Sequence, residues 1–227
     1  VTAVRVVLGV LLQPALLGIA LFYPPGTFAW QRAWVIMAVF FAATVMSLAA
    51  LARARPDLLA ERFKPPLQRG QPAADKVAVL GFIAAFAGAI RFIPFDVFQL
   101  HWLPPPGQGA AYAGLVLVIV GWWIVTAAML ANAFAVPVVK HQADRHQHVI
   151  DRGPYAIVRH PMYSGISLVM LGMPLWLGSS AGVLVALVPI AVLAVRIGIE
   201  EAFLRRELAG YADYAARVRA RLVPFVW

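Results

Sequence analysis

The sequence contains long apolar runs close to the roughly 20 residues that a helix needs to cross a hydrocarbon core of about 30 Å. Hydrophobic residues make up 62% of the chain, charged residues 13%, and the mean hydropathy is +0.80. A soluble domain of 227 residues cannot bury so large an apolar fraction. The runs lack the alternating polar and apolar residues of β-barrel strands. Because lipid offers no hydrogen-bond partners to the backbone, segments that span it without forming a barrel must be helices. We therefore predict an all-α integral membrane protein.

Proline and glycine clusters divide the apolar sequence into spans, at Pro24-Pro25, at 104–107 and at 178–180. The predicted transmembrane helices cover residues 5–22, 33–52, 76–93, 110–134, 161–178 and 181–199. The last two form a hairpin, because a single span there would carry the arginine-rich tail to the wrong side. No small-residue cleavage site precedes Pro24, so we expect the first run to be retained rather than removed as a signal peptide.

The basic residues explain the formal net charge of +9 without a nucleic-acid partner. They gather in three segments, at 53–76, 140–159 and 196–221. A topology with six spans places these three segments and Arg5 on one side of the membrane. Arg32 and Arg91 then lie on the opposite side. By the positive-inside rule that side, with both termini, is cytoplasmic, and the expected partners are membrane lipids. Sixteen Arg against three Lys is typical of GC-rich bacteria, so we expect a bacterial cytoplasmic (inner) membrane.

A polar cluster lies between two apolar stretches in the segment GPYAIVRHPMYSG, residues 153–165. Pro161 is predicted to begin a helix, since its missing N–H is not needed in the first turn. His160 then lies just outside the helix and Tyr163 one turn in. Free N–H groups at such a start favour a carboxylate, for example that of an amino-acid-like cofactor. The alternative is structural, with Arg159 and Tyr163 as interfacial anchors and His160 as a cap.

A second cluster follows the hairpin, where Arg196 and Glu200 stand four residues apart on one helix face. Such a pair can form a bridge and position a polar substrate. Glu201 points about 100° away and need not share that role. The alternative is a pair of solvated charges at a helix end.

Three further segments have weaker signals. Residues 200–221 carry apolar side chains at helical spacing and predict a cytoplasmic C-terminal amphipathic helix, which we favour on the lipid headgroups over a lid across a site. For residues 55–63 we favour an interfacial helix over a substrate contact. His141, His146 and His148 match no metal-ligand spacing, and the chain has no cysteine, so no metal site is predicted.

The two clusters together resemble a known family. The order GPYxxVRHPxYxG, helical hairpin, RxxxEExxL, GYxxY and a closing Pro224-Phe225 is similar to that of the isoprenylcysteine carboxyl methyltransferases and their bacterial relatives among phospholipid-methyltransferase-like proteins. The match covers residues 153–227. The first 130 residues correspond to this family only as a set of membrane helices. The expected organisation is a single membrane methyltransferase domain, with four helices in 1–134 and the motif loop, hairpin and C-terminal helix in 135–227.

The resemblance implies methyl transfer dependent on S-adenosylmethionine, with S-adenosylhomocysteine as product, to a lipophilic small molecule or lipidated substrate. It assigns catalysis to Arg196, which would orient the acceptor, and to Glu200, which would hold the arginine. It assigns cofactor binding to further motif residues: Gly153, Tyr155, His160, Pro161, Tyr163 and Glu201.

The implied acceptor is the carboxylate of a prenylcysteine-like thioether. Such a carboxylate has no proton to remove, so alignment and desolvation are sufficient. A phospholipid amine or small thiol is the alternative acceptor. Lesser alternatives are a membrane reductase using NADPH, for which no GxGxxG fingerprint is present, and a non-enzymatic membrane protein. The sequence carries no signal for an oligomeric state.

Overall fold

The computed structural model describes residues 3–68, 70–140, 142–224 and 226, and every regular element among them is helical. The long helices are α1 (Ala3–Phe22), α2 (Gln31–Ala54), α4 (Ala73–Phe95), α5 (Gln108–Ala131), α6 (Pro161–Leu177) and α7 (Ser180–Glu207). The shorter elements are α3 (Pro56–Arg62), α8 (Tyr211–Arg217), a π-helical turn (Asp96–Leu100) and 3-10 turns at Ala143–Arg145 and Gly153–Ala156.

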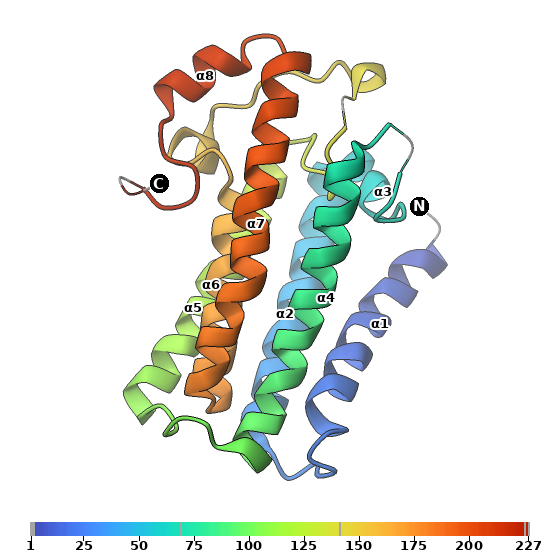
Figure 1. The fold of residues 1–227 in the computed structure, drawn as a ribbon. Coiled ribbons are helices and arrows are strands. Elements are labelled where there is room, and N and C mark those ends of the chain that lie inside the picture. Colours follow the sequence, from blue (N-terminus) through green and yellow to red (C-terminus); the bar gives the residue numbers. More distant parts are fainter. Residues whose placement is uncertain (1–2, 69, 141, 225, 227) are drawn as a thin grey trace.

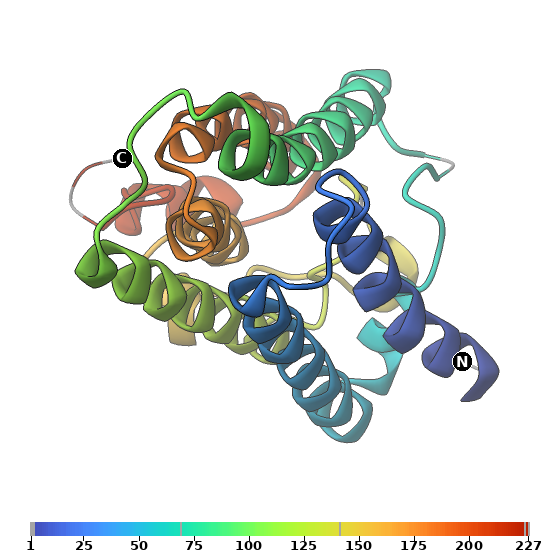
Figure 2. The same ribbon diagram turned by 90° about the horizontal axis from the view of Figure 1, so that it is seen from below.

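The long helices run side by side in one bundle (Figure 1). Helix α5 packs along α6, and α4 packs along α7, while α1 contacts α2 and α4 at the edge of the bundle (Figure 2). The largest buried cluster lies among α1, α2, α5 and α6 and includes Leu21, Ile36, Val118 and Met173. Large apolar side chains such as those of Leu12, Trp123 and Val195 face outward, as expected for a surface covered by lipid.

Helices α2, α5, α7 and the stretch Ala73–Leu100 are each long and apolar enough to cross a membrane. The prediction of an all-α membrane protein is confirmed. Helix α6, with 17 residues, is roughly 25 Å long, and the apolar part of α1 from Val10 to Phe22 is shorter still. The count of six spans therefore stays a prediction, although each predicted span corresponds to a helix.

Helices α5 and α6 approach one another at paired glycines. A Cβ on Gly165 would lie 2.4 Å from the carbonyl oxygen of Gly121, and one on Gly172 would lie 2.3 Å from that of Gly114. Small residues allow such backbone contact, which strengthens helix association in lipid, where apolar burial alone contributes little. This close packing fixes the start of α6 beside the end of α5.

The predicted hairpin is present between α6 and α7. Helix α6 ends at Gly178, whose φ of 100° suits the left-handed conformation that glycine tolerates. Ser179 then caps α7 by accepting a hydrogen bond from the backbone N–H of Gly182 at 2.8 Å. The turn brings the chain back toward the end at which α6 began.

The C-terminal region differs from the single amphipathic helix predicted for 200–221. Helix α7 continues to Glu207, Gly210 turns the chain with a φ of 79°, and α8 follows. Tyr211 and Tyr214 are 4% and 3% exposed, because α8 folds back over the motif loop (Figure 1). The prediction of one continuous helix was wrong because Gly210 breaks it, whereas the contact with lipid headgroups stays a prediction.

The segment at 55–63 likewise packs on protein. Helix α3 buries Leu58 and Leu59 against a cluster that includes Met129 and Ala135. Its end lies beside the loop that follows α5, at the same end of the bundle as the motif loop and α8 (Figure 1). The favoured interfacial role therefore does not account for the whole segment, because Arg62 lines the cavity described below.

Candidate active site

The motif loop is joined to the returning tail by backbone hydrogen bonds. The N–H of Arg159 donates to the carbonyl of Ala220, and that of His160 donates to Arg221, both at 2.9 Å. The Ser164 hydroxyl donates to the carbonyl of Leu222 at 2.6 Å. Residues more than fifty positions apart thus form one structural unit, with Pro161 beginning α6 as predicted.

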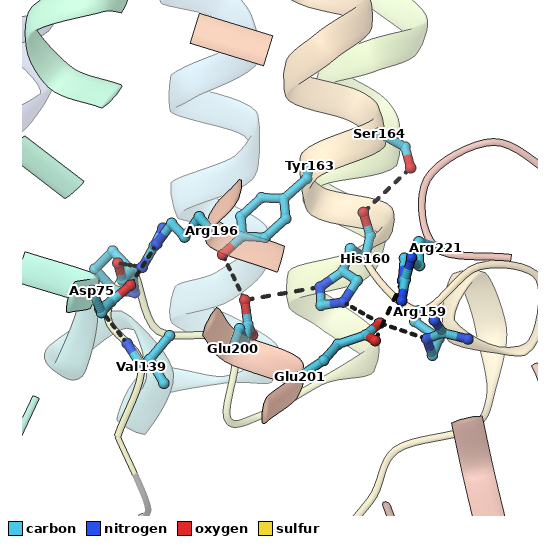
Figure 3. Close-up of polar contacts among 11 residues, drawn as sticks. Asp75, Val139, Arg159, His160, Tyr163, Ser164, Arg196, Glu200, Glu201 and Arg221 are labelled. Carbon is cyan, nitrogen blue, oxygen red and sulfur yellow. Dashed lines mark hydrogen bonds and ion pairs between the residues drawn. The ribbon is translucent and has the colours of Figure 1, made fainter. Parts of the chain in front are cut away.

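Glu201 holds this unit together from α7. Its carboxylate accepts hydrogen bonds from Arg159 Nε at 2.7 Å and Arg221 Nε at 3.4 Å, and lies 3.2 Å from His160 Nε2 (Figure 3). Arg159 also donates to the carbonyl of Val218 at 2.7 Å. With its side chain only 5% exposed, Glu201 positions the loop and tail.

Glu200, its neighbour, points elsewhere. Its side chain is 27% exposed, and Oε2 accepts a hydrogen bond from the Tyr163 hydroxyl at 2.8 Å (Figure 3). His160 Nδ1 lies 3.8 Å from the same carboxylate, and the His160 and Tyr163 rings are parallel with centroids 5.5 Å apart. The divergence expected from the helical period is therefore observed, since Glu200 lies near Nδ1 of His160 and Glu201 near Nε2.

Arg196 is held by Asp75 of α4 and not by Glu200. Arg196 Nε donates to Asp75 Oδ1 at 2.8 Å, and its NH2 group donates to the carbonyl of Pro137 at 2.6 Å. The expected bridge between Arg196 and Glu200 is absent from the hydrogen bonds and ion pairs of the described residues. The physical reason is that Tyr163 lies between them, with its ring 5.7 Å from the guanidinium and its hydroxyl on Glu200 (Figure 3).

Asp75 is fully buried and has a complete set of donors. Besides Arg196, it accepts from the Gln71 side chain at 2.6 Å and from the backbone N–H of Val139 at 2.9 Å. The carboxylate thereby joins α4, α7 and the loop after α5. The sequence offered one signal for Asp75, namely its helical spacing to Val79 and Phe82. These two residues share its face of α4 and line the cavity.

These groups surround a cavity of about 350 Å³, within the roughly 300–1,000 Å³ of small-molecule sites. Five predicted site residues line it, namely Tyr155, His160, Tyr163, Arg196 and Glu200. Gly153, Pro161 and Glu201 do not line it and act on its shape through the loop. One wall is apolar and includes Val79, Phe82, Ile83 and Ile166.

Some lining residues were not predicted. They include Arg62, Asn132, Lys140 and the tail tyrosines Tyr211 and Tyr214. The Tyr211 hydroxyl is buried and has no hydrogen-bond partner among the described residues. Burial raises the pKa of the Tyr155 hydroxyl far above its ordinary value, so this side chain is neutral. The GYxxY spacing was the available signal for Tyr211 and Tyr214.

The histidine segment provides no metal site in the described parts of the chain, where no group of three His, Asp or Glu side chains is arranged to hold an ion. His148 lines the cavity and packs edge-on against Phe134, with ring centroids 5.1 Å apart. His141 and Phe225 lie outside the described residues.

Comparison with known proteins identifies the family. The sequence model of the family described as Phospholipid methyltransferase matches residues 110–209, from α5 to the end of α7. Protein-S-isoprenylcysteine O-methyltransferase B of Arabidopsis thaliana is 32% identical over 153 residues, which cover 66% of this chain and 71% of that protein. Protein-S-isoprenylcysteine O-methyltransferase A of the same plant is 34% identical over 139 residues, covering 60% and 67%.

A probable protein-S-isoprenylcysteine O-methyltransferase of Oryza sativa subsp. indica is 34% identical over 120 residues, covering 51% of this chain and 62% of the rice protein. These relatives are plant proteins, so they give no support to the expected bacterial source. They do decide against the reductase and non-enzymatic alternatives. The chain belongs to the isoprenylcysteine carboxyl methyltransferase family of membrane-embedded methyltransferases that depend on S-adenosylmethionine.

Proposed function

We propose that this protein methylates the carboxylate of a prenylcysteine-like thioether, and that the reaction takes place in the cavity beside Arg196. The main observation is that one cavity combines charged and tyrosine side chains from both sequence clusters with an apolar wall from α4 and α6. An amphiphilic acceptor needs both surfaces. The names of the plant relatives support this substrate class.

The lining residues fit S-adenosylmethionine, which carries an amino-acid group, a sulfonium and a nucleoside. The buried Tyr211 hydroxyl without a protein partner suits a polar ligand group. The Glu200 carboxylate offers a counter-charge to a cation. When bound, the cofactor supplies a methyl group already activated by the sulfonium. Tyr155, His160, Tyr163 and Tyr211 would line its pocket.

Arg196 would orient the acceptor carboxylate with the guanidinium donors that Asp75 and Pro137 leave free. The ion pair with Asp75 fixes the arginine before the acceptor arrives, which lowers the entropy cost of alignment. Glu200, fixed by Tyr163, would complete the polar end of the cavity. Gly153 and Pro161 would shape the loop, and Glu201 would hold it against the tail.

A cytoplasmic orientation of the cavity end is part of this proposal. The three basic segments, the motif loop and α8 lie at that end of the bundle, as the positive-inside rule requires for a cytoplasmic face (Figure 1). The six crossings, the bacterial inner membrane and one functional unit combining 1–134 with 135–227 belong to the same proposal. Contacts of Asp75 with both parts support the single unit.

Methylation of a phospholipid amine is the second candidate, favoured by the description of the matching family model. An amine acceptor must lose a proton, for which the Glu200 carboxylate beside His160 is available as a base. A panel of prenylcysteine acids, phosphatidylethanolamine and small thiols would separate these acceptors under one assay.

The first test is calorimetric titration of S-adenosylmethionine and S-adenosylhomocysteine into the detergent-purified protein. We expect saturable binding, weakened about tenfold or more by Glu200→Gln for the cationic cofactor. Glu207→Gln is the matched control, since Glu207 is an exposed residue of the same helix. Absence of binding to correctly folded protein would refute the proposal, and equal effects of both variants would remove Glu200 from the site.

A further inference from the structure

The basic side chains that line the cavity differ in how their charge is balanced. They are Arg62, Lys140, Arg159 and Arg196. Three of them contact a carboxylate: Lys140 with Glu61 at 3.0 Å, Arg159 with Glu201 at 2.7 Å and Arg196 with Asp75 at 2.8 Å. Carboxylates of the protein therefore already balance the positive charge of these three side chains.

Arg62 is the exception. Among the described residues its guanidinium has no ion pair, and its recorded hydrogen bond is from NH1 to the carbonyl of Ala135 at 2.7 Å. A guanidinium carries five N–H donors, so this one bond leaves most of them available. Arg62 therefore brings both positive charge and donors to the cavity.

The position of Arg62 is fixed from two sides. It is the last residue of α3, whose Leu58 and Leu59 pack against the cluster that includes Ala135. The bond to the Ala135 carbonyl then anchors the head group at the loop after α5. This arrangement holds the guanidinium beside the cavity before any ligand binds.

The surroundings of Arg62 favour a neutralising anion. Burial lowers the pKa of its guanidinium, which means that the protein around it replaces water without supplying an equal counter-charge. Arg62 lines the same cavity as Tyr155 and Tyr163, which belong to the proposed cofactor pocket. A partly buried cation of this kind gains free energy when an anion binds beside it.

We propose that Arg62 binds a ligand carboxylate in the cavity, through the donors that Ala135 leaves free. The inference rests on the proposed function, which brings two carboxylates to this cavity. One belongs to the amino-acid group of the cofactor and the other to the thioether acceptor. Both present the planar pair of oxygens that a guanidinium binds with two parallel hydrogen bonds.

Arg62→Gln tests this binding, because glutamine keeps an N–H donor for the Ala135 carbonyl and removes the charge. The matched control is Arg55→Gln. Arg55 precedes α3 and donates from Nε to the carbonyl of Leu130 at 2.9 Å, but it does not line the cavity. Each variant weakens one hydrogen bond from the α3 segment, that of Arg62 to the loop after α5 and that of Arg55 to the last turn of α5, so their melting temperatures should fall by similar amounts.

Two arms distinguish the source of the carboxylate. In the first, calorimetry compares S-adenosylhomocysteine with 5′-methylthioadenosine, which lacks the amino-acid group. If the cofactor carboxylate is bound, Arg62→Gln raises the Kd of S-adenosylhomocysteine about ten- to hundredfold and leaves that of methylthioadenosine unchanged. In the second, the KM of N-acetyl-S-farnesylcysteine at saturating cofactor is compared with the inhibition constant of its uncharged amide.

In either arm, an increase in Kd or KM that is confined to the ligand with a carboxylate supports the inference. The arm in which it occurs identifies whether the cofactor or the acceptor supplies that carboxylate. Unchanged constants in both arms, or the same change in Arg55→Gln, would overturn it. Wild-type protein that binds none of these probes would instead refute the proposed function. The two failures are therefore distinguishable.

Discussion

A buried aspartate lies at each end of α4, Asp75 in its first turn and Asp96 directly after its last residue, and the two are held in different ways. Asp75 is 0% and Asp96 2% exposed. Asp75 pairs with the guanidinium of Arg196 at 2.8 Å. Asp96 accepts hydrogen bonds from the Ser179 hydroxyl at 2.5 Å and from the backbone N–H of Trp102 at 3.0 Å.

The difference separates a carboxylate that holds a cavity side chain from one that only joins helices. The recorded donors to Asp96 are neutral and connect α4 with the α6–α7 turn, so its role is to join helices at the end away from the cavity (Figure 1). The partner of Asp75 is Arg196, which lines the cavity, so Asp75 also determines where the arginine proposed to orient the acceptor points. Burial alone does not distinguish these roles, whereas the identity of the donors does.

Replacing Asp75 should have the largest effect. Asp75→Ala leaves Arg196 as a buried charge without its carboxylate, which costs about 3–5 kcal/mol of stability. Asp75→Asn keeps an acceptor for the N–H of Val139 but not the charge that pairs with Arg196, so it should recover only part of the stability, while kcat stays about tenfold or more below wild type. Thermal unfolding and initial rates measure the two effects. Full recovery of kcat by Asp75→Asn would reduce Asp75 to a purely structural role.

Replacing Asp96 should affect stability alone. Asp96→Ala removes the acceptor of two hydrogen bonds, which costs about 2–3 kcal/mol. The rate per folded molecule should stay at the wild-type level, because Asp96 does not line the cavity. The melting temperature and kcat of the purified variant check this contrast. If kcat of Asp96→Ala falls as far as that of Asp75→Asn, the two aspartates do not differ in role.

Removing the Tyr163 hydroxyl should give a smaller effect, confined to the cavity. Tyr163→Phe keeps the ring against His160 and Arg196 but releases Glu200 from its 2.8 Å hydrogen bond. A hydrogen bond to a charged group contributes about 1.5–3 kcal/mol, so we expect a roughly tenfold loss in kcat/KM. Tyr112→Phe, on an exposed ring of α5, is the control and should leave the rate unchanged. Equal losses of kcat/KM in Tyr163→Phe and Tyr112→Phe would contradict the role given to the hydrogen bond between Tyr163 and Glu200.

The smallest effect is expected at Glu61, which pairs with Lys140 at the edge of the cavity. Burial raises the pKa of Glu61, but hydrogen bonds from Lys64 and Lys140 outweigh this and leave it below the ordinary 4.5. A lowered pKa stabilises the fold above pH 4.5, and this contribution is lost as the pH falls through the folded value. Glu61→Gln should cost less than about 1 kcal/mol at pH 7. Melting curves of variant and wild type should converge on acidification, and a constant difference would contradict this.

The sequence predicted the helices well because each boundary has a local cause. Proline clusters, Gly178 and apolar runs act over a few residues, and the bounds of α2, α5 and α6 lie close to the predicted spans. The predicted lining residues Tyr155, His160 and Tyr163 stand in one short motif, and helical spacing alone separates the directions of Glu200 and Glu201. These features need no knowledge of distant contacts.

The remaining features depend on contacts between segments far apart in the sequence. Asp75 meets Arg196 across 121 positions, and Arg62 meets Ala135 across 73, and neither Asp75 nor Arg62 lies in a recognisable motif. The tail was mispredicted as one continuous helix because its amphipathic pattern continues past Gly210, where the helix breaks. The burial of Tyr211 and Tyr214 comes from tertiary contacts, which that pattern does not specify.

The hydrogen bonds between the motif loop and the carbonyls of residues 218–222 have a consequence for biosynthesis. The apolar helices can enter the membrane one after another as they leave the ribosome, but Arg159, His160 and Ser164 lack their partners until residues 218–222 emerge. Membrane insertion thus precedes formation of the cavity. A chain that ends after α7 would lack these carbonyls, so we expect it to insert without retaining a ligand.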